Sequence, residues 1–168
     1  MQSQNSDIAS WLGPRPVKVY LKDEEIKKIV RDSIKSIPYA VGMNIHMGAL
    51  ASENERVVSD VMKVAKEKDI YFVDSVTSPR TVCRQVAKKI GVKIIGRNVF
   101  LEHSSKTKDY IKKHLAIAGD MALKNGYAVA IGHVGSAGGK VTAEAIKEMI
   151  PELESKGIKF VYISELIK

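Results

Sequence analysis

The most informative part of the chain is the stretch AVGMNIHMGA, which occupies residues 40–49. It begins as an apolar strand, then presents the polar side chains of Asn44 and His46, and continues into the small residues Gly48 and Ala49. Open α/β sheets and α/β barrels carry their chemistry at the carboxyl ends of parallel strands. The stretch therefore predicts a buried strand that delivers polar groups to a site.

Two other apolar segments end in polar side chains. The segment 70–73 is followed by Asp74 and Ser75, and the segment 127–131 leads into His133. A single histidine after a strand is more often a hydrogen-bonded structural residue. With three polar strand ends at one edge, the structural and the functional interpretations carry about equal weight. We predict that the imidazoles of His46 and His133 and the carboxylate of Asp74 converge on one pocket mouth.

Length and composition predict one soluble globular domain over residues 1–168. No apolar run reaches the ~20 residues that a membrane-spanning helix needs, so we expect no membrane span. The polar N-terminus has none of the features of a signal peptide, which predicts a cytoplasmic location for the chain as given. The single cysteine, Cys83, lies in a helical pattern, which favours a small buried apolar residue over a catalytic thiol.

The net charge of +8 raises nucleic acid as a partner. The basic residues are mostly lysines spread over predicted helix faces, and only 6% of the residues are aromatic. No basic stretch is interleaved with side chains that could stack on bases. The charge therefore indicates a solvated surface, and we expect no nucleic-acid partner.

Alternating helices and strands indicate a mostly parallel α/β sheet of βα units. Residues 1–20 are expected to form an irregular N-terminal arm, and residues 21–168 the βα repeats. The expected strands cover 40–45, 70–73, 93–95, 99–101, 127–131 and 158–163. The expected helices cover 23–37, 52–65, 78–90, 105–125 and 139–156, the last one interrupted at Pro151.

Local signals set several helix ends. Ser52 begins a capping box, Ser78 precedes a proline at a first helical position, and Ser105 begins the long helix. Gly91 and Gly126 are expected to end helices, because glycine readily adopts the left-handed conformation found there.

The glycine-rich stretch 132–140 is not a nucleotide-binding loop. Val134 stands where the phosphate-loop motif needs its first glycine, and Val141 stands where it needs a Ser or Thr. No nucleophile elbow surrounds Ser75. A metal site is the better chemical match, because zinc takes neutral imidazole and carboxylate ligands.

Four motifs together resemble the divergent polysaccharide deacetylase family over residues 12–168. They are VGMNIHMG at 41–48, FVDSVTSP at 72–79, VFLE at 99–102 and AIGH at 130–133. The family has close counterparts of each in the same order, with an aspartate where this chain has Glu102.

This resemblance implies the C-terminal part of a distorted (β/α) barrel and removal of acetyl groups from N-acetylated carbohydrates. It implies a divalent metal, with zinc the first choice, bound by His46. Asp74 would take a catalytic role near the metal, and His133 would be the acid that protonates the leaving amine.

The resemblance also implies a carbohydrate substrate that contacts Asn44, Ser75 and Arg80. Arg80 would position a carboxylate or stabilise an oxyanion, although a role on a helix surface is equally compatible with the sequence. Family members usually work in the cell envelope.

One departure leaves two functions open. The family's paired aspartates and a further histidine motif are absent, so the chain looks like the C-terminal portion of a family member. It is then either a metal-dependent deacetylase or a non-catalytic domain that binds carbohydrate or a protein partner. An incomplete sheet has an open edge, which we expect the N-terminal arm or a second copy in a homo-oligomer to cover.

Overall fold

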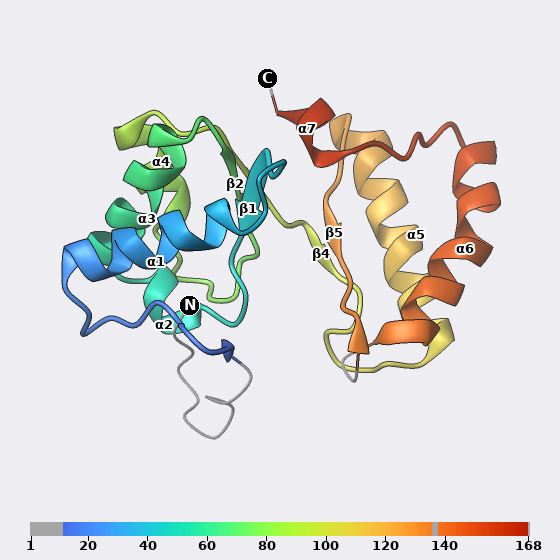
Figure 1. The fold of residues 1–168 in the computed structure, drawn as a ribbon. Coiled ribbons are helices and arrows are strands. Elements are labelled where there is room, and N and C mark those ends of the chain that lie inside the picture. Colours follow the sequence, from blue (N-terminus) through green and yellow to red (C-terminus); the bar gives the residue numbers. More distant parts are fainter. Residues whose placement is uncertain (1–11, 136–137, 168) are drawn as a thin grey trace. The chain divides into compact units, whose positions relative to one another are not determined.

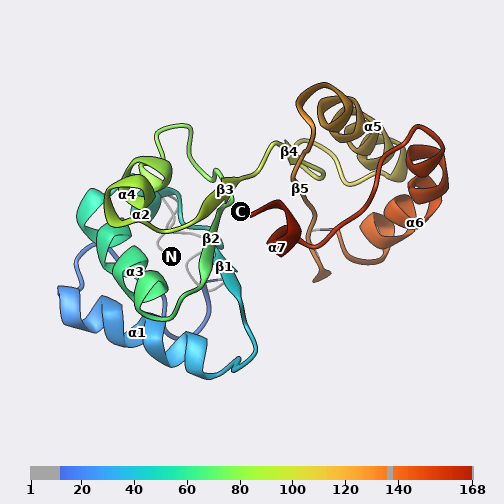
Figure 2. The ribbon, with the colours of Figure 1, turned by 90° about the horizontal axis from the view of Figure 1, so that it is seen from above.

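The computed structural model describes residues 12–135 and 138–167, and these form two compact units. The first unit runs to Gly96, and the second covers Arg97–Leu166. Figure 1 and Figure 2 show the ribbon of each unit from two directions. Compact units can belong to one domain, so the single domain expected over 1–168 stays a prediction.

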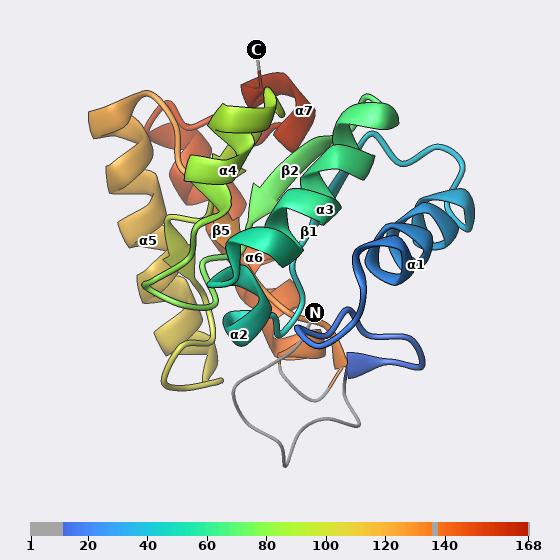
Figure 3. The ribbon, with the colours of Figure 1, turned by 90° about the vertical axis from the view of Figure 1, so that its left-hand side faces the viewer.

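The first unit is a three-stranded parallel sheet with helices packed against it. The strand order is β1-β2-β3, which leaves β1 and β3 at the edges. Helix α3 packs against both α1 and α4, and Figure 3 shows the three helices side by side. The elements are α1 (Asp23–Lys35), β1 (Gly42–Asn44), α2 (Ala49–Ser52), α3 (Glu55–Glu67), β2 (Tyr71–Asp74), α4 (Cys83–Ile90) and β3 (Ile94–Gly96). The predicted α/β class with parallel strands is confirmed.

The core of the first unit is built on the apolar face of α3. Apolar side chains recur along this helix at intervals of three and four residues, which places them on one face. The buried apolar residues of α3 are Val57, Val58, Val61, Met62, Val64 and Ala65. They share a cluster with Ile26 of α1, Phe72 of β2 and Val86 of α4. This shared core holds the helices on the sheet.

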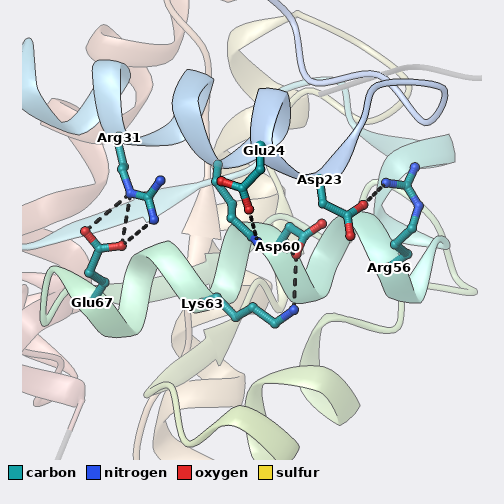
Figure 4. A network of polar contacts seen from close by, with 8 residues as sticks. Asp23, Glu24, Arg31, Arg56, Asp60, Lys63 and Glu67 are labelled. Atoms are coloured by element: carbon teal, nitrogen blue, oxygen red, sulfur yellow. Dashed lines mark hydrogen bonds and ion pairs between the residues drawn. The ribbon is translucent and has the colours of Figure 1, made fainter.

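Charged side chains join α1 to α3 along the rim of this core (Figure 4). Arg31 Nη2 lies 2.8 Å from Glu67 Oε2, and Arg56 Nη1 lies 2.6 Å from Asp23 Oδ1. The hydrogen bond from Arg31 holds the pKa of the Glu67 carboxyl below its usual range. Since these side chains are exposed, the pairs contribute little to stability and mainly fix the register of the two helices.

Parallel pairing places the carboxyl ends of the three strands at one edge of the sheet. Asn44 of β1 lies beside Val73 of β2, and Asp74 of β2 lies beside Gly96 of β3. The residues that leave these strands therefore emerge at a common edge, as expected for a parallel α/β protein.

The described part of the second unit contains a two-stranded parallel sheet, β4-β5, and the α-helices α5, α6 and α7. Its elements are β4 (Val99–Phe100), α5 (Lys108–Asn125), β5 (Ala130–Ile131), α6 (Gly139–Ser155) and α7 (Ile163–Leu166). The core holds Val99, Leu101, Ile111, Leu115, Ala145, Met149 and Leu153. Among the described helices, none is long and apolar enough to cross a membrane.

The strand expected over 158–163 is wrong. Residues 158–162 form neither helix nor strand, and Ile163–Leu166 is helix α7. Ile158 packs on the core of the second unit, whereas Phe160 is 43% exposed. The segment lines a cavity of about 510 Å³ beside α5 and β5 instead of pairing with β5. Alternating apolar residues predict an extended segment, but they do not supply a partner strand.

The interruption expected at Pro151 is also wrong, because α6 runs through it without a break. Proline removes one backbone hydrogen bond from a helix. Pro151 itself is exposed, while Ala145, Met149 and Leu153 on the same helix are buried. Burial on both sides of the proline keeps the helix continuous.

Local signals place some helix ends correctly. Gly91 and Gly126 end α4 and α5 in the left-handed conformation, at φ values of 79° and 84°, as predicted. The capping box expected at Ser52 is wrong. Asn54 is the N-cap of α3, and its side chain accepts a hydrogen bond from the Val57 N–H at 3.1 Å.

Two other serines make turns instead of beginning helices. Helix α4 begins at Cys83, while Ser78 Oγ accepts a hydrogen bond from the Arg80 N–H at 3.1 Å. Helix α5 begins at Lys108, while Ser105 Oγ accepts a backbone N–H two residues further on. Serine hydroxyls compete with helical hydrogen bonding in this way.

The described part of the N-terminal arm lies beside the first sheet. Residues 12–22 precede α1 without forming an α-helix or strand, and Val17 is buried in the core of the first unit. Residues of the arm and of β1 together line a cavity of about 260 Å³. In the described part of the chain, β1 pairs only with β2. That a second copy of the chain covers the other edge of β1 stays a prediction. Residues 1–11 lie outside the described residues.

Replacing Phe72 with alanine tests the core of the first unit. Phe72 is 1% exposed, so truncation should lower the free energy of unfolding by about 3–5 kcal/mol through lost burial and an unfilled cavity. Tyr39 is 94% exposed, and Tyr39→Ala should change stability by less than about 0.5 kcal/mol. Urea unfolding followed by circular dichroism measures both variants. Equal losses would contradict the assigned core.

Candidate functional site

The carboxyl edge of the first sheet brings two of the predicted site residues together. Asn44 Nδ2 donates a hydrogen bond to Ser75 Oγ at 3.2 Å, which joins the end of β1 to the residue after β2. Asn44 and His46 are exposed, whereas Ser75 is buried. The edge thus offers an amide and an imidazole to solvent, with a hydroxyl behind them.

Backbone strain lies at the same two strand exits. Met47 has a φ of 50°, and Val76 has a φ of 46°. A positive φ is an outlier for a β-branched residue such as valine, because its side chain then crowds the backbone. Strain of this kind often occurs at functional sites, where the surrounding structure holds it in place. Here the Val76 N–H is held by Asp74 Oδ1 at 2.9 Å.

Asp74 is buried, and both of its oxygens are engaged locally. Oδ1 accepts the Val76 N–H, and Oδ2 accepts a hydrogen bond from Thr81 Oγ1 at 3.0 Å. The carboxylate therefore organises the loop that follows β2. This supporting role accounts for its position without any ligand.

Arg80 is held by an acidic partner within the first unit. Its guanidinium donates to both carboxylate oxygens of Glu53, at 3.1 Å and 3.0 Å, and the Ser78 hydroxyl donates to the same carboxylate. Paired guanidinium and carboxylate groups neutralise each other and hold a fixed geometry. Of the two roles that the sequence leaves open for Arg80, this contact favours the structural one.

The metal donors of the first unit do not form a metal site by themselves. His46 offers an exposed imidazole, and Asp74 already uses both oxygens. Over the described ranges, no group of three or more His, Cys, Asp or Glu side chains is arranged to hold a metal ion. Zinc normally needs at least three protein ligands, so the donors present here do not fit it.

In the second unit, His133 is bound to a buried glutamate. Glu102 Oε2 lies 3.1 Å from His133 Nδ1, and Glu102 Oε1 accepts the His133 backbone N–H at 3.0 Å. Oε1 also accepts a hydrogen bond from the Thr142 hydroxyl at 2.6 Å. The Glu102 side chain is only 2% exposed, whereas that of His133 is 31% exposed. Residues from the ends of β4 and β5 and from α6 thus meet at one carboxylate.

Two glycines allow this close approach. A β-carbon on Gly138 would collide with Glu102 Oε1 and Thr142 Oγ1, and a β-carbon on Gly132 would lie 3.2 Å from Glu102 Oε1. The glycine-rich stretch after β5 therefore leaves room for a buried carboxylate, a role that the sequence does not reveal.

The hydrogen bonds keep Glu102 ionised. Burial favours the neutral acid and would raise the pKa of the Glu102 carboxyl, but hydrogen bonds from Thr142 and from His133 outweigh it and lower the pKa. An ionised carboxylate at Nδ1 favours a proton on that nitrogen. Nε2 then becomes the acceptor, and it has no hydrogen-bond partner among the described residues.

Glu102 is the functional residue that the sequence analysis misses. Its position in VFLE marks it only as a departure from the aspartate of the family motif. An acidic residue after one strand and a histidine after another do form a detectable signal, but only if the two strands are known to be neighbours. Figure 1 shows β4 and β5 side by side, and their pairing brings the two residues together.

The other two histidines and the single cysteine have structural surroundings. His103 is exposed near the Phe100 ring, and His114 stacks on Tyr110 with ring centroids 4.1 Å apart. Burial raises the pKa of the Cys83 thiol to about 12, so this cysteine stays protonated at neutral pH. The interpretation of Cys83 as a buried apolar residue is confirmed.

The predicted convergence of three groups involves both compact units. His46 and Asp74 belong to the first unit, and His133 belongs to the second. Each unit supplies its own strand-end cluster, and a common pocket mouth for all three groups stays a prediction.

Parallel strands with polar groups at their carboxyl ends define an α/β protein, and proteins of this class bind their ligands at that edge of the sheet. The chain matches the divergent polysaccharide deacetylase family over residues 1–167, and it belongs to that family. The family predicted from the four sequence motifs is thereby confirmed.

Two curated relatives and one solved structure resemble the chain. It is 35% identical over 133 residues to the uncharacterised protein YibQ of Escherichia coli, covering 79% of this chain and 41% of that protein. It is 34% identical over 122 residues to an uncharacterised protein of Haemophilus influenzae, covering 73% of this chain and 41% of that protein. The chain thus spans about two fifths of the length of the curated relatives it matches.

The solved structure is that of an uncharacterised protein from Agrobacterium tumefaciens. It matches 98% of this chain and 65% of its own chain, with a TM-score of 0.83 and 21% sequence identity. At this identity the likeness shows the fold alone. It agrees with the parallel α/β class of both units.

Acid titration tests the buried carboxylate. Because folding lowers the Glu102 pKa, its stabilisation is fully present above the ordinary value of 4.5 and is lost as the pH falls through the lowered value. Glu102→Gln should therefore lower the free energy of unfolding at pH 7 by about 1–3 kcal/mol, and the difference from the wild type should shrink below pH 4.5.

The matched control is Glu154→Gln, which changes an exposed glutamate on α6. Urea unfolding at a series of pH values gives the free energies of all three proteins. A difference between wild type and Glu102→Gln that stays constant down to pH 3 would argue against an ionised, hydrogen-bonded Glu102.

Proposed function

We propose that the chain acts in the N-deacetylation of a carbohydrate, with His133 as the group that transfers a proton. Membership of the divergent polysaccharide deacetylase family supports a hydrolase with a carbohydrate substrate. The observation that carries the proposal is the hydrogen bond between the buried Glu102 and His133 Nδ1, which orients the half-exposed imidazole.

Amide hydrolysis needs a proton on the leaving nitrogen, because an amine anion is too basic to depart. In the proposed reaction, His133 accepts a proton at Nε2 from the water that adds to the acetyl carbonyl. The same imidazole then gives this proton to the departing amine as the bond from carbon to nitrogen breaks. The products are the free amino sugar and acetic acid, which ionises to acetate. Glu102 stabilises the protonated imidazole and keeps it oriented, and positioned groups of this kind contribute about 10²–10⁴-fold to rate.

Zinc at His46 is a separate proposal. The family resemblance supports a divalent metal, but the described residues supply His46 without two further ligands around it. No step of the proposed proton transfer is therefore derived through a metal. His46 would supply one ligand to such an ion.

A second candidate function is a non-catalytic domain that binds carbohydrate or a protein partner. The polar contacts of the first unit favour this non-catalytic alternative, since the Asp74 carboxylate holds its own loop and Arg80 is paired with Glu53. In this alternative the exposed Asn44 and His46 still contact sugar hydroxyls. The domain then holds its ligand and leaves it unchanged.

Acetate release tests the proposed reaction. His133→Gln removes the titratable imidazole and should lower kcat/KM for an N-acetylated oligosaccharide such as chitotetraose by about 10²-fold or more. His103→Gln is the matched control, because His103 is an exposed histidine of the same unit. An enzyme-coupled acetate assay measures all three proteins.

Unchanged turnover in His133→Gln would remove the proton-transfer role. Binding of chitotetraose by calorimetry without acetate release would instead support the non-catalytic alternative. Neither binding nor release would contradict both candidates.

Calorimetric titration with zinc tests the metal proposal. The metal proposal requires zinc binding by the wild type that is lost in His46→Ala, because the replacement removes the imidazole ligand. His103→Ala is the control and should bind as the wild type does. Wild-type protein that takes up no zinc would contradict the assignment of His46 as a ligand.

A further inference from the structure

One segment of the first unit concentrates positive charge. Residues 75–96 contain no aspartate or glutamate, although the chain as a whole has 19 acidic residues. Five basic residues lie in this segment, namely Arg80, Arg84, Lys88, Lys89 and Lys93. Arg80 is paired with Glu53 and Lys89 with Glu55, so acidic residues from outside the segment neutralise part of this charge.

Arg84 differs from its paired neighbours. It lies in the first turn of α4, it is exposed, and its side chain makes no ion pair or hydrogen bond with any residue in the described part of the chain. Its Nη2 is 3.6 Å from the position that a β-carbon would take on Gly96, the last residue of β3. The guanidinium therefore rests against the bare backbone at the carboxyl end of that strand.

This position belongs to the edge that carries the candidate site. Gly96 is the register partner of Asp74, and a side-chain carbon of Val76 lies 4.0 Å from the same β-carbon position. Asp74 forms no ion pair with Arg84, and its oxygens accept hydrogen bonds from Thr81 and from the Val76 N–H. The Arg84 guanidinium thus stands at the strand exits without an ion-pair partner among the described residues.

The Asn44–Ser75 pair lies at the same edge, on the far side of β2. Strand spacing puts it about 10 Å from the end of β3. Amide and hydroxyl groups suit sugar hydroxyls, whereas a guanidinium matches the two oxygens of a carboxylate or phosphate with two parallel N–H donors. The edge therefore offers neutral donors on one strand and an anion-binding group two strands away.

We propose that Arg84 recognises an anionic substituent, a carboxylate or a phosphate, on the carbohydrate that this chain binds. The inference rests on the proposed function for its carbohydrate ligand, and it narrows that ligand to acidic N-acetylated sugars. Arg84 is then a specificity-determining residue, and Arg80, for which the sequence leaves this role open, supports the loop beside it.

Binding measurements with N-acetylated sugars of different charge test this inference. The probes are a hyaluronan tetrasaccharide, which carries carboxylates, N-acetylglucosamine 6-phosphate, which carries a phosphate, and chitotetraose in its neutral tetra-N-acetyl form. The wild type should bind at least one anionic probe more tightly than chitotetraose, and the probe that it prefers identifies the substituent. Arg84→Gln should weaken that binding roughly tenfold, as expected for loss of a charge-assisted hydrogen bond, and leave chitotetraose binding unchanged.

Lys93→Gln is the matched control. It removes one positive charge from the same acid-free segment, but Lys93 precedes β3 and so lies at the opposite end of that strand from Gly96. Its affinity for the anionic probe should match that of the wild type. Equal weakening in Arg84→Gln and Lys93→Gln would show general charge attraction and overturn the proposal.

The outcome separates this inference from the proposed reaction. Selective anion binding through Arg84 without acetate release would leave the inference standing and remove the deacetylase. Acetate release from neutral and acidic substrates at equal rates, unchanged in Arg84→Gln, would support the deacetylase and overturn the role of Arg84.

Discussion

Parallel pairing is the constraint on which both units depend. When neighbouring strands run in the same direction, every loop that leaves a strand at its carboxyl end emerges at one edge. The pairing of Asp74 with Gly96 in β2 and β3 brings Arg84 of α4 to the edge that also holds Asn44 and Ser75. The pairing of β4 with β5 brings Glu102 and His133 together in the same way. Residues distant in sequence thus meet without any local motif.

The two strand-end clusters use their charged groups differently. In the first unit, Asp74 and the pair formed by Arg80 and Glu53 fix the loop after β2, which leaves the exposed polar groups of Asn44 and Arg84 for ligands. In the second unit the buried carboxylate orients an imidazole. The first arrangement suits binding, and the second suits proton transfer.

Sequence periodicity predicts the elements and the strand-end residues because both depend on local patterns. The buried face of α3 and the glycine ends of α4 and α5 are cases where one local preference dominates. The segment 158–162 is the opposite case, since alternation predicts an extended chain but cannot supply a neighbouring strand. The roles of Arg80 and Glu102 were likewise hidden, because each depends on a partner that only the fold provides. The start of α3 is a local case, because Ser52 and Asn54 lie two residues apart and both can cap a helix, and the structure uses Asn54.

The packing around Glu102 makes several sequence positions depend on one another, because a change at one of them disturbs the contacts of the others. Gly132 and Gly138 leave room for a carboxylate on the longer glutamate side chain, which reaches one methylene further than the aspartate of the family motif. A return to aspartate would draw the carboxylate away from Thr142, and a bulkier residue at Gly138 would displace it. Homologues should therefore exchange these positions as a set, so that the acid, the hydroxyl and the glycines covary.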